Sequence, residues 1–325
     1  MTAEILSRLP GLSALVVGDI CLDRWCTYDP RESEPSRETG IPRTGVVSTT
    51  VSPGAGGTIA NNLVALGVGR VAVLGACGND GFGHELRCAL ASRGIAGDHL
   101  ITAPSMQTFT YTKLINGCTG EEDLPRVDYI NTAPLDPGAE RQILAGLQTL
   151  FDTFDVVLVS DQAETRRGGV VTPGMRDLLA DLAPNYPDKV CIVDSRARTG
   201  EFRKVILKPN RQEAEAACRA LFGVVDYPRL RAHVEAPFLM VTHGEDGVVL
   251  VTEAGEQCAP ARKVGKPVDI CGAGDSFNAG AAVALAVTRS PLQAARFGNL
   301  VASITIMQKG TGAASPEQLL NAARS

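Results

Sequence analysis

Short apolar runs alternate along the chain with longer segments whose apolar residues recur at helical spacing. The apolar, β-branched runs are typical of buried strands and cover residues 14–20, 70–76, 155–160, 189–194, 204–209, 238–243 and 247–253. The helix-like segments cover residues 58–67, 83–94, 139–154, 175–183, 211–223, 275–288, 291–308 and 315–323. This alternation predicts an α/β fold, in which helices cover both faces of a largely parallel sheet.

Two polar, turn-rich stretches interrupt this pattern. Residues 21–52 end in the alternating segment TGVVSTTVS, and residues 105–131 read as two strands joined by a turn at NGCTGEED. Excursions from an α/β core commonly form a lid or a partner contact, and a pair of ordinary surface hairpins is the alternative. Since the sequence has no long linker, we expect one domain over residues 1–325, with a small β-strand lid built from about 21–52 and 105–131.

Composition narrows the class of protein. The chain has 325 residues, of which 44% are hydrophobic and 21% charged, and its formal net charge is -5. The acidic balance argues against a nucleic-acid or anionic-membrane partner, and no apolar run reaches the ~18–20 residues of a membrane span. The nine cysteines form no C-x-x-C pair, the four histidines show no metal-binding spacing, and the N-terminus has no secretory pattern. We therefore expect a cytoplasmic protein with reduced, mostly buried thiols.

The most informative stretch is DICGAGDSFNAG, residues 269–280. Glycines ahead of a helix let backbone N–H groups converge on an anion, and the helix dipole adds positive charge there. A carboxylate beside such a site, here Asp275, makes sense as a base that takes a proton from a hydroxyl attacking the anion. That layout is typical of phosphoryl transfer to an alcohol. The alternative is an ordinary aspartate N-cap, which the pattern alone favours.

A second motif is KPNRQEAE, residues 208–215. Asn210 and Glu213 are spaced to share one face at a helix start, where the carboxylate could hold Mg²⁺ directly or through water. The alternative is a capping box, in which both residues only close the helix end. The sequence contains neither a G-x-x-x-x-G-K-[ST] loop nor a G-x-G-x-x-G turn after its first strand, so a P-loop and a Rossmann site are unsupported.

Taken together, these motifs resemble the ribokinase-like (PfkB) family of sugar kinases over nearly the whole chain. The resemblance implies a ribokinase-like three-layer α/β/α sandwich, with Asp275 as general base and an anion hole formed by the amides of Gly272, Ala273 and Gly274. It assigns ATP and Mg²⁺ as cofactors and leaves open a monovalent cation such as K⁺. The residues that it places at the nucleotide or its Mg²⁺ are Asn210, Glu213, Thr242, Gly244, Gly247 and, in a weakly matching late loop at 307–316, Lys309. For the T-x-G-x-x-G segment, a plain hairpin turn is the alternative.

The resemblance also assigns residues to the sugar that accepts the phosphoryl group. Asp23, just beyond the first strand, matches the residue that holds sugar hydroxyls in the family. The Gly-rich stretch 52–67 departs from the family's pattern and can be aligned in two registers. One register places Gly54, Ala55 and Thr58 at the sugar, and the other places Gly56, Gly57 and Asn61 there.

Within the family, the segments GDICLDRW, SRETGIP, YTKL and PRVDYI are most similar to the heptose-phosphate kinase branch. This similarity implies an acceptor that already carries a phosphate, held by Arg37, Lys113 and Arg126; solvated surface charges are the alternative. We also expect a homodimer formed through the lid, and a kinase module only, since no nucleotidyltransferase segment follows. The alternatives are the same chemistry on a fructose phosphate, a ribose or a nucleoside, or a non-catalytic protein that senses a sugar or nucleotide.

Overall fold

A central sheet of nine strands runs through the molecule in the order β13-β12-β11-β10-β9-β8-β1-β4-β5. The computed structural model describes residues 1–324. The strands are β1 (Ser13–Gly18), β4 (Arg70–Cys77), β5 (Ala96–Thr102), β8 (Val156–Asp161), β9 (Val190–Ser195), β10 (Ile206–Leu207), β11 (Leu239–Thr242), β12 (Val248–Thr252) and β13 (Gly255–Ala259). All neighbours pair in parallel except β11 with β12 and β12 with β13. The carboxyl ends of the parallel strands therefore share one edge, where sheets of this kind bind ligands.

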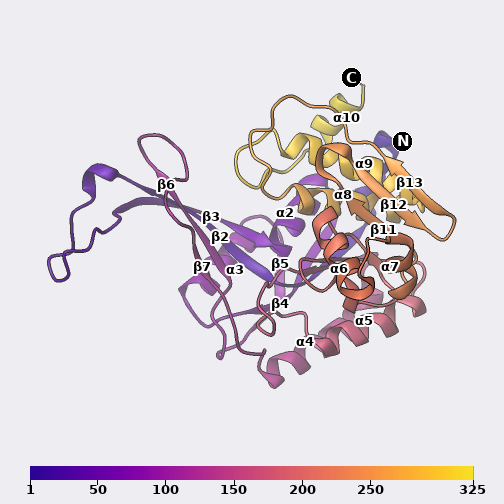
Figure 1. Cartoon of the computed structure of the whole chain (residues 1–325), viewed down its shortest axis with the longest axis horizontal. Coiled ribbons are helices and arrows are strands. Elements are labelled where there is room, and N and C mark those ends of the chain that lie inside the picture. Colours follow the sequence, from indigo (N-terminus) through magenta and orange to yellow (C-terminus); the bar gives the residue numbers. More distant parts are fainter. Residues whose placement is uncertain (325) are drawn as a thin grey trace.

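Helices cover both faces of this sheet (Figure 1). One face packs against α1 (Thr2–Arg8), α2 (Gly56–Leu66), α3 (Gly81–Ala91), α8 (Ala273–Thr288), α9 (Pro291–Thr305) and α10 (Pro316–Arg324). The other packs against α4 (Pro137–Leu150), α5 (Pro173–Asn185), α6 (Arg211–Phe222) and α7 (Tyr227–His233). Along β1, Ala14 and Val16 enter the first core while Leu15 and Val17 enter the second, because successive strand residues face opposite sides. The three layers agree with the predicted sandwich.

A second sheet of four strands stands beside this core in the order β3-β2-β6-β7. Its strands are β2 (Ile20–Tyr28), β3 (Val46–Ala55), β6 (Thr110–Asn116) and β7 (Val127–Tyr129). Both stretches predicted as excursions contribute to it, and the loop 29–45 projects beyond it at the left of Figure 1. Edge strand β3 exposes its first five residues, including Val46 and Val47. That this second sheet acts as a lid stays a prediction.

The sequence pattern missed four elements, namely α1, α7, β5 and β13. The two helices span seven residues each, too short for a clear periodicity. Strand β13 (GEQCA) is mostly exposed and polar, so it carries no apolar run. Strand β5 (AGDHLIT) was missed for the same reason, since Leu100 is its only buried residue.

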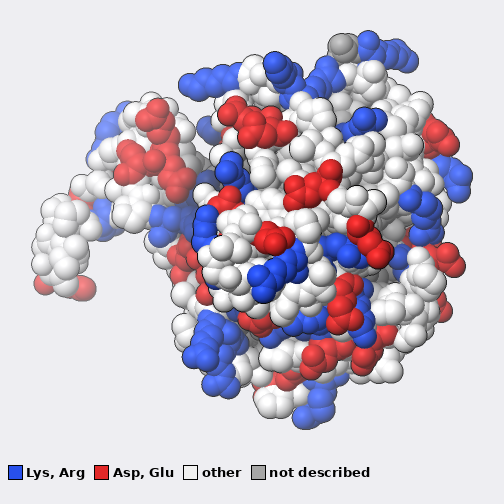
Figure 2. Space-filling model, turned by 45° about the vertical axis from the view of Figure 1, so that its right-hand side comes forward, with Lys and Arg blue, Asp and Glu red and all other residues white. Residues whose placement is uncertain are grey.

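Charges and cysteines complete the description of the surface. Figure 2 shows Lys and Arg interspersed with Asp and Glu on the face that it draws, in keeping with the small net charge. All nine cysteines are free, but Cys88, Cys118 and Cys258 are exposed, so the expectation of mostly buried thiols fails for these three. Within residues 1–324, no helix has the combination of length and apolar character needed to cross a bilayer.

Candidate active site

A cavity of about 140 Å³ lies between the second sheet and the carboxyl edge of the central sheet. Its walls are formed by Asp23, Arg24, Trp25, Ala55, Thr58, Tyr111, Lys113, Arg126, Gln162, Arg196, Cys271, Gly272, Asp275 and Thr311. One wall comes from β2, β6 and the start of α2, and the other from the ends of β8 and β9 and the start of α8. Residues far apart in sequence therefore meet here, and several of them were predicted for both sides of a transfer reaction.

Asp275 lies in the first turn of α8, on the cavity wall. The N-cap of α8 is Gly272, in the left-handed conformation with φ 77°, and no side chain caps the helix, so the alternative of an aspartate N-cap does not hold. Helix N-termini leave backbone N–H groups without partners inside the helix, which makes them suitable for anions. Of the three predicted anion-hole amides, that of Ala273 donates to the carbonyl of Ile270 at 3.2 Å, so the amides of Gly272 and Gly274 are the candidates.

The surroundings of Asp275 make it a proton acceptor suited to near-neutral pH. Burial and the nearby carboxylate of Asp194 raise its pKa to about 8, against the attraction of Lys208 and Arg196. Lys208 Nζ forms a buried ion pair with Asp194 Oδ2 at 2.9 Å. The same ammonium lies 3.8 Å from the position that a Cβ on Gly274 would take, directly behind the proposed anion hole. A base whose pKa lies near the working pH is the kind that catalysis requires.

Asn210 and Glu213 form the capping box that was the alternative for this motif. Glu213 N donates to Asn210 Oδ1 at 2.9 Å, and Asn210 N donates to Glu213 Oε2 at 2.7 Å. The box uses one carboxylate oxygen and leaves the other for a cation or its water shell. In the part of the chain that the structure describes, no group of three or more His, Cys, Asp or Glu could hold a metal alone. This donor set fits Mg²⁺, which commonly takes one or two carboxylates and completes its shell with phosphates and water.

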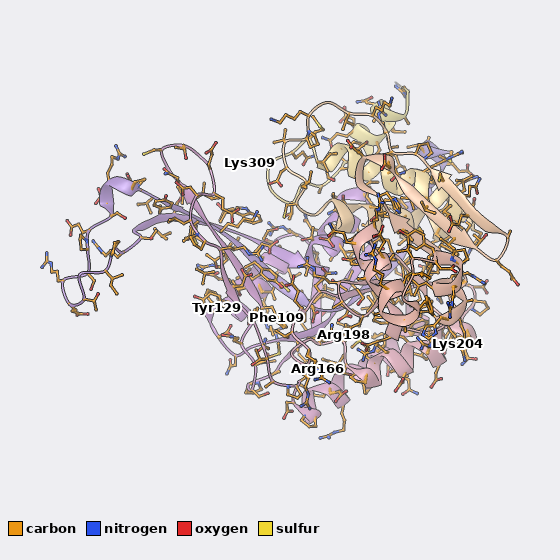
Figure 3. The ribbon with its side chains drawn as sticks, in the orientation of Figure 1. Phe109, Tyr129, Arg166, Arg198, Lys204 and Lys309 are labelled. Atoms are coloured by element: carbon orange, nitrogen blue, oxygen red, sulfur yellow. The ribbon has the colours of Figure 1, made fainter. Side chains whose placement is uncertain are left out.

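Thr242, Gly244 and Gly247 lie at the connection between β11 and β12, which pair as an antiparallel hairpin. The plain hairpin turn, which was the alternative interpretation of the T-x-G-x-x-G segment, is therefore present. Thr242 N also donates to the carbonyl of Pro209 at 3.0 Å, which places this hairpin beside the capping box of α6. Lys309 is exposed on the late loop (Figure 3). A nucleotide role for these residues stays a prediction.

A second hollow of about 320 Å³ is lined in part by the late loop 307–316. Thr311 lines the first, and Gln308 lines the second. The lining of the second hollow comprises Arg262, Val264, Ser303, Ile304, Met307, Gln308, Gln318 and Ala322. Its apolar members offer a surface on which a flat ring could pack.

On the acceptor side, the cavity contains Asp23, Ala55 and Thr58. A Cβ at Gly54 would lie within 2.7 Å of Asp23 Oδ2, so glycine is needed here for this carboxylate to approach the chain. Burial raises the pKa of Asp23 to about 6, and the charges of Lys113 and Arg126 oppose this shift. The first register of the Gly-rich stretch therefore faces the cavity. The lining, as described within residues 1–324, does not include the residues of the second register, Gly56, Gly57 and Asn61.

The three cations predicted to hold a phosphate differ in position. Lys113 and Arg126 line the cavity, where Lys113 Nζ lies 3.3 Å from Glu122 Oε2. Arg126 donates from Nε and Nη2 to the two carboxylate oxygens of Asp128, each at 2.7 Å. Arg37 is exposed on the projecting loop 29–45 and lies outside the cavity, so its inclusion in this group was wrong. A loop that extends away from the core cannot be placed at a site by sequence spacing.

Sequence reasoning missed two residues at the ends of central strands. Gln162 follows β8, and Arg196 follows β9, and both line the cavity. The signal was available, because residues just past the carboxyl ends of parallel strands are expected at the ligand site. Asp19, which follows β1, instead points inward and accepts N–H groups from Gln162, Ala163 and Val170, each at 2.8 Å.

Comparison with known proteins identifies carbohydrate kinases that the chain resembles. The family model described as pfkB family carbohydrate kinase matches residues 197–318. The predicted resemblance to the PfkB family is confirmed. Curated relatives include "Bifunctional protein HldE" of Pelobacter propionicus, 28% identical over 327 residues, and of Caulobacter sp., 30% identical over 336 residues; each match covers 98% of this chain. The chain spans only 64% and 65% of the length of these two curated relatives.

Solved structures that are similar to this chain establish the fold. Ribokinase from Thermotoga maritima matches with a TM-score of 0.71 at 22% identity, covering 97% of this chain and 100% of that chain. Phosphofructokinase-2 from Escherichia coli in complex with potassium matches with a TM-score of 0.74 at 18% identity, covering 96% and 99%. The predicted ribokinase-like sandwich is confirmed.

Proposed function

We propose that the chain is an ATP-dependent carbohydrate kinase, which transfers the terminal phosphoryl group of ATP to a hydroxyl of a sugar or sugar phosphate. The observation that carries this proposal is Asp275 on the cavity wall at the start of α8, with Asp23 in the same cavity. The match of residues 197–318 to the pfkB carbohydrate kinases supports it.

In the proposed reaction, Asp23 accepts hydrogen bonds from acceptor hydroxyls and so orients the sugar. Asp275 takes the proton of the attacking hydroxyl. That oxygen forms a bond to the terminal phosphorus, and the bond to the bridging oxygen breaks, so that its electron pair leaves on ADP. The amides at the start of α8 stabilise the charge on the transferred group. Mg²⁺, which Glu213 would hold, neutralises nucleotide phosphate charge when bound. A monovalent cation remains part of the proposal, supported by the E. coli structure in complex with potassium.

For the acceptor, we propose a heptose phosphate or a sugar phosphate of similar shape. The motif resemblance to the heptose-phosphate kinase branch supports this choice, as do the relatives named HldE. Lys113 and Arg126 supply positive charge around Asp23 on the acceptor side. Fructose 6-phosphate is the second candidate, because a similar structure is that of phosphofructokinase-2 in complex with fructose-6-phosphate, with a TM-score of 0.71.

The experiment is ADP release from ATP and Mg²⁺ across a panel of free and phosphorylated sugars. We expect turnover with sugar phosphates and the highest kcat/KM with a heptose phosphate. Nucleotide binding without turnover on any acceptor would contradict the kinase and favour the sensing protein. A free sugar used at least as well as its phosphate would contradict the acceptor class alone.

For the assembly, we propose a cytoplasmic homodimer in which the second sheet of one copy covers that of the other. The exposed edge of β3, with Val46 and Val47, supports this arrangement, since an uncovered strand edge tends to pair. The free cysteines are in keeping with a reducing compartment.

A further inference from the structure

Three arginines line the cavity, and they differ in how their guanidinium groups are used. Arg126 is occupied on two nitrogens by Asp128 and lies 5.1 Å from the centre of the Tyr111 ring. Arg24 pairs through Nε with Glu85 at 3.2 Å and lies over the Phe82 ring at 4.8 Å. Both are thus anchored in the second sheet and packed on aromatic rings, which restricts their movement.

Arg196 is held differently. Within residues 1–324 it forms one ion pair, which joins Nη1 to Glu164 Oε1 at 2.6 Å, and the two side chains are 48% and 70% exposed. Ion pairs exposed to water contribute little, so an anion entering the cavity can displace Glu164 at low cost. The remaining N–H groups of the guanidinium can then donate to a phosphoryl group, because arginine binds two phosphate oxygens at once.

The position of Arg196 points to the transfer step rather than to the acceptor. It follows β9 two residues after Asp194, whose partner Lys208 has its Nζ 3.8 Å from the position of a Cβ on Gly274, in the first turn of α8. Arg196 and Asp275 line the same cavity, and the charge of Arg196 lowers the pKa of this proposed base. The charges of Lys113 and Arg126, for their part, oppose the rise in the pKa of Asp23.

We propose that Arg196 is a catalytic residue whose guanidinium contacts the phosphoryl group as it passes from ATP to the acceptor hydroxyl. This inference rests on the proposed kinase function. While the oxygen–phosphorus bond to the acceptor forms and the bond to ADP breaks, negative charge spreads over three phosphoryl oxygens. Arg196 stabilises that charge from the end of β9, in the cavity that the start of α8 also lines.

The loop that carries Glu164 is fixed at its base, which keeps the ion pair in place between reactions. Asp19 accepts N–H groups from both ends of this loop, at Gln162, Ala163 and Val170. Arg198 (Figure 3) donates to Asp161 Oδ1 at 2.8 Å and to the carbonyl of Thr165 at 2.6 Å. Glu164 is therefore the partner of Arg196 in the free protein, is displaced when an anion binds, and plays no part in the transfer itself.

The test compares Arg196→Gln with Glu164→Gln, which remove opposite members of the same ion pair. We expect Arg196→Gln to lower kcat about 100-fold, a loss typical of one charge-stabilising donor, with the acceptor KM changed less than about threefold. Glu164→Gln should keep kcat within about twofold. Equal effects of both variants on kcat would show a merely structural ion pair and overturn the proposal.

A binding measurement separates this inference from the kinase function on which it rests. Calorimetric titration with ADP, Mg²⁺ and aluminium fluoride, which imitates the transferring phosphoryl group, is compared with ADP and Mg²⁺ alone. Aluminium fluoride should raise the affinity of the wild-type protein for ADP, and we expect Arg196→Gln to lose this increase. The affinity of the variant for ADP and Mg²⁺ alone should be unchanged. A wild-type protein that binds no ADP would refute the kinase, whereas unchanged behaviour of the variant would refute only Arg196. Arg196→Lys keeps the positive charge but not the planar guanidinium, so its kcat should lie between those of the wild type and Arg196→Gln.

A raised acceptor KM at constant kcat in Arg196→Gln would also contradict the proposal.

Discussion

The ionisation of Asp275 should control the rate of the proposed reaction over the neutral pH range. With a pKa of about 8 in place of the ordinary 3.8, this base is mostly protonated at neutral pH. A base that acts only when ionised is active in about one molecule in ten at one pH unit below its pKa, and in about nine in ten at one unit above. We therefore expect kcat/KM to rise about tenfold between pH 7 and pH 9.

The assay is ADP release at saturating Mg²⁺ over about pH 6 to pH 10, with Asp275→Asn as the matched variant. The variant keeps the shape of the side chain and lacks the proton acceptor, so it should lose at least about 10²-fold in kcat while nucleotide affinity changes little. A flat profile, or an acid limb near the pKa of an ordinary carboxyl group, would refute the reasoning. So would near-wild-type turnover of the variant.

The same raised pKa predicts an effect on stability, with a sign opposite to that of a salt-bridged aspartate. Between the ordinary value of 3.8 and about 8, the folded state keeps a proton that the unfolded state has released. The free energy of unfolding therefore falls as pH rises through this window, because the unfolded state binds fewer protons. Asp275→Asn removes this contribution and should raise the melting temperature at pH 7. An unchanged or lower melting temperature would contradict the burial on which the pKa shift depends.

Four further predictions concern the metal, the acceptor and the assembly. Glu213→Gln should raise the Mg²⁺ concentration needed for half-maximal activity. Helix α6 should stay capped, because glutamine still offers an oxygen to Asn210 N, so an unchanged Mg²⁺ titration would leave Glu213 only its capping role. Lys113→Ala and Arg126→Ala should raise KM for phosphorylated acceptors selectively, and the exposed Arg37→Ala is the control expected to have no effect. Gly54→Ala should weaken acceptor binding, measured as KM, because its Cβ would meet the Asp23 carboxylate; equal KM values would refute the close approach. Light scattering at micromolar concentration should give the mass of two chains, and a monomer would rule out the dimer.

The sequence by itself determined most of the order of elements and indicated the motif on which the proposed transfer depends. Buried strands such as β8 and β9 are continuous apolar runs, because both faces of a parallel sheet are covered by helices. The proposed base and its glycines lie in one short motif, so their relation follows from local helix geometry. The heptose-phosphate resemblance likewise depends on short motifs that can be compared letter by letter.

Only the tertiary structure decided which distant residues share the cavity. It brought Asp23 and Lys113 from the second sheet to Asp275, left Arg37 outside on a projecting loop, and selected the register of Gly54 over its alternative. It also added Arg196, which no local motif marks. The physical reason is that strand order and the crossing of chain segments set these distances, and burial together with neighbouring charge sets each pKa. Such properties depend on contacts between segments hundreds of residues apart, which spacing along the chain does not encode.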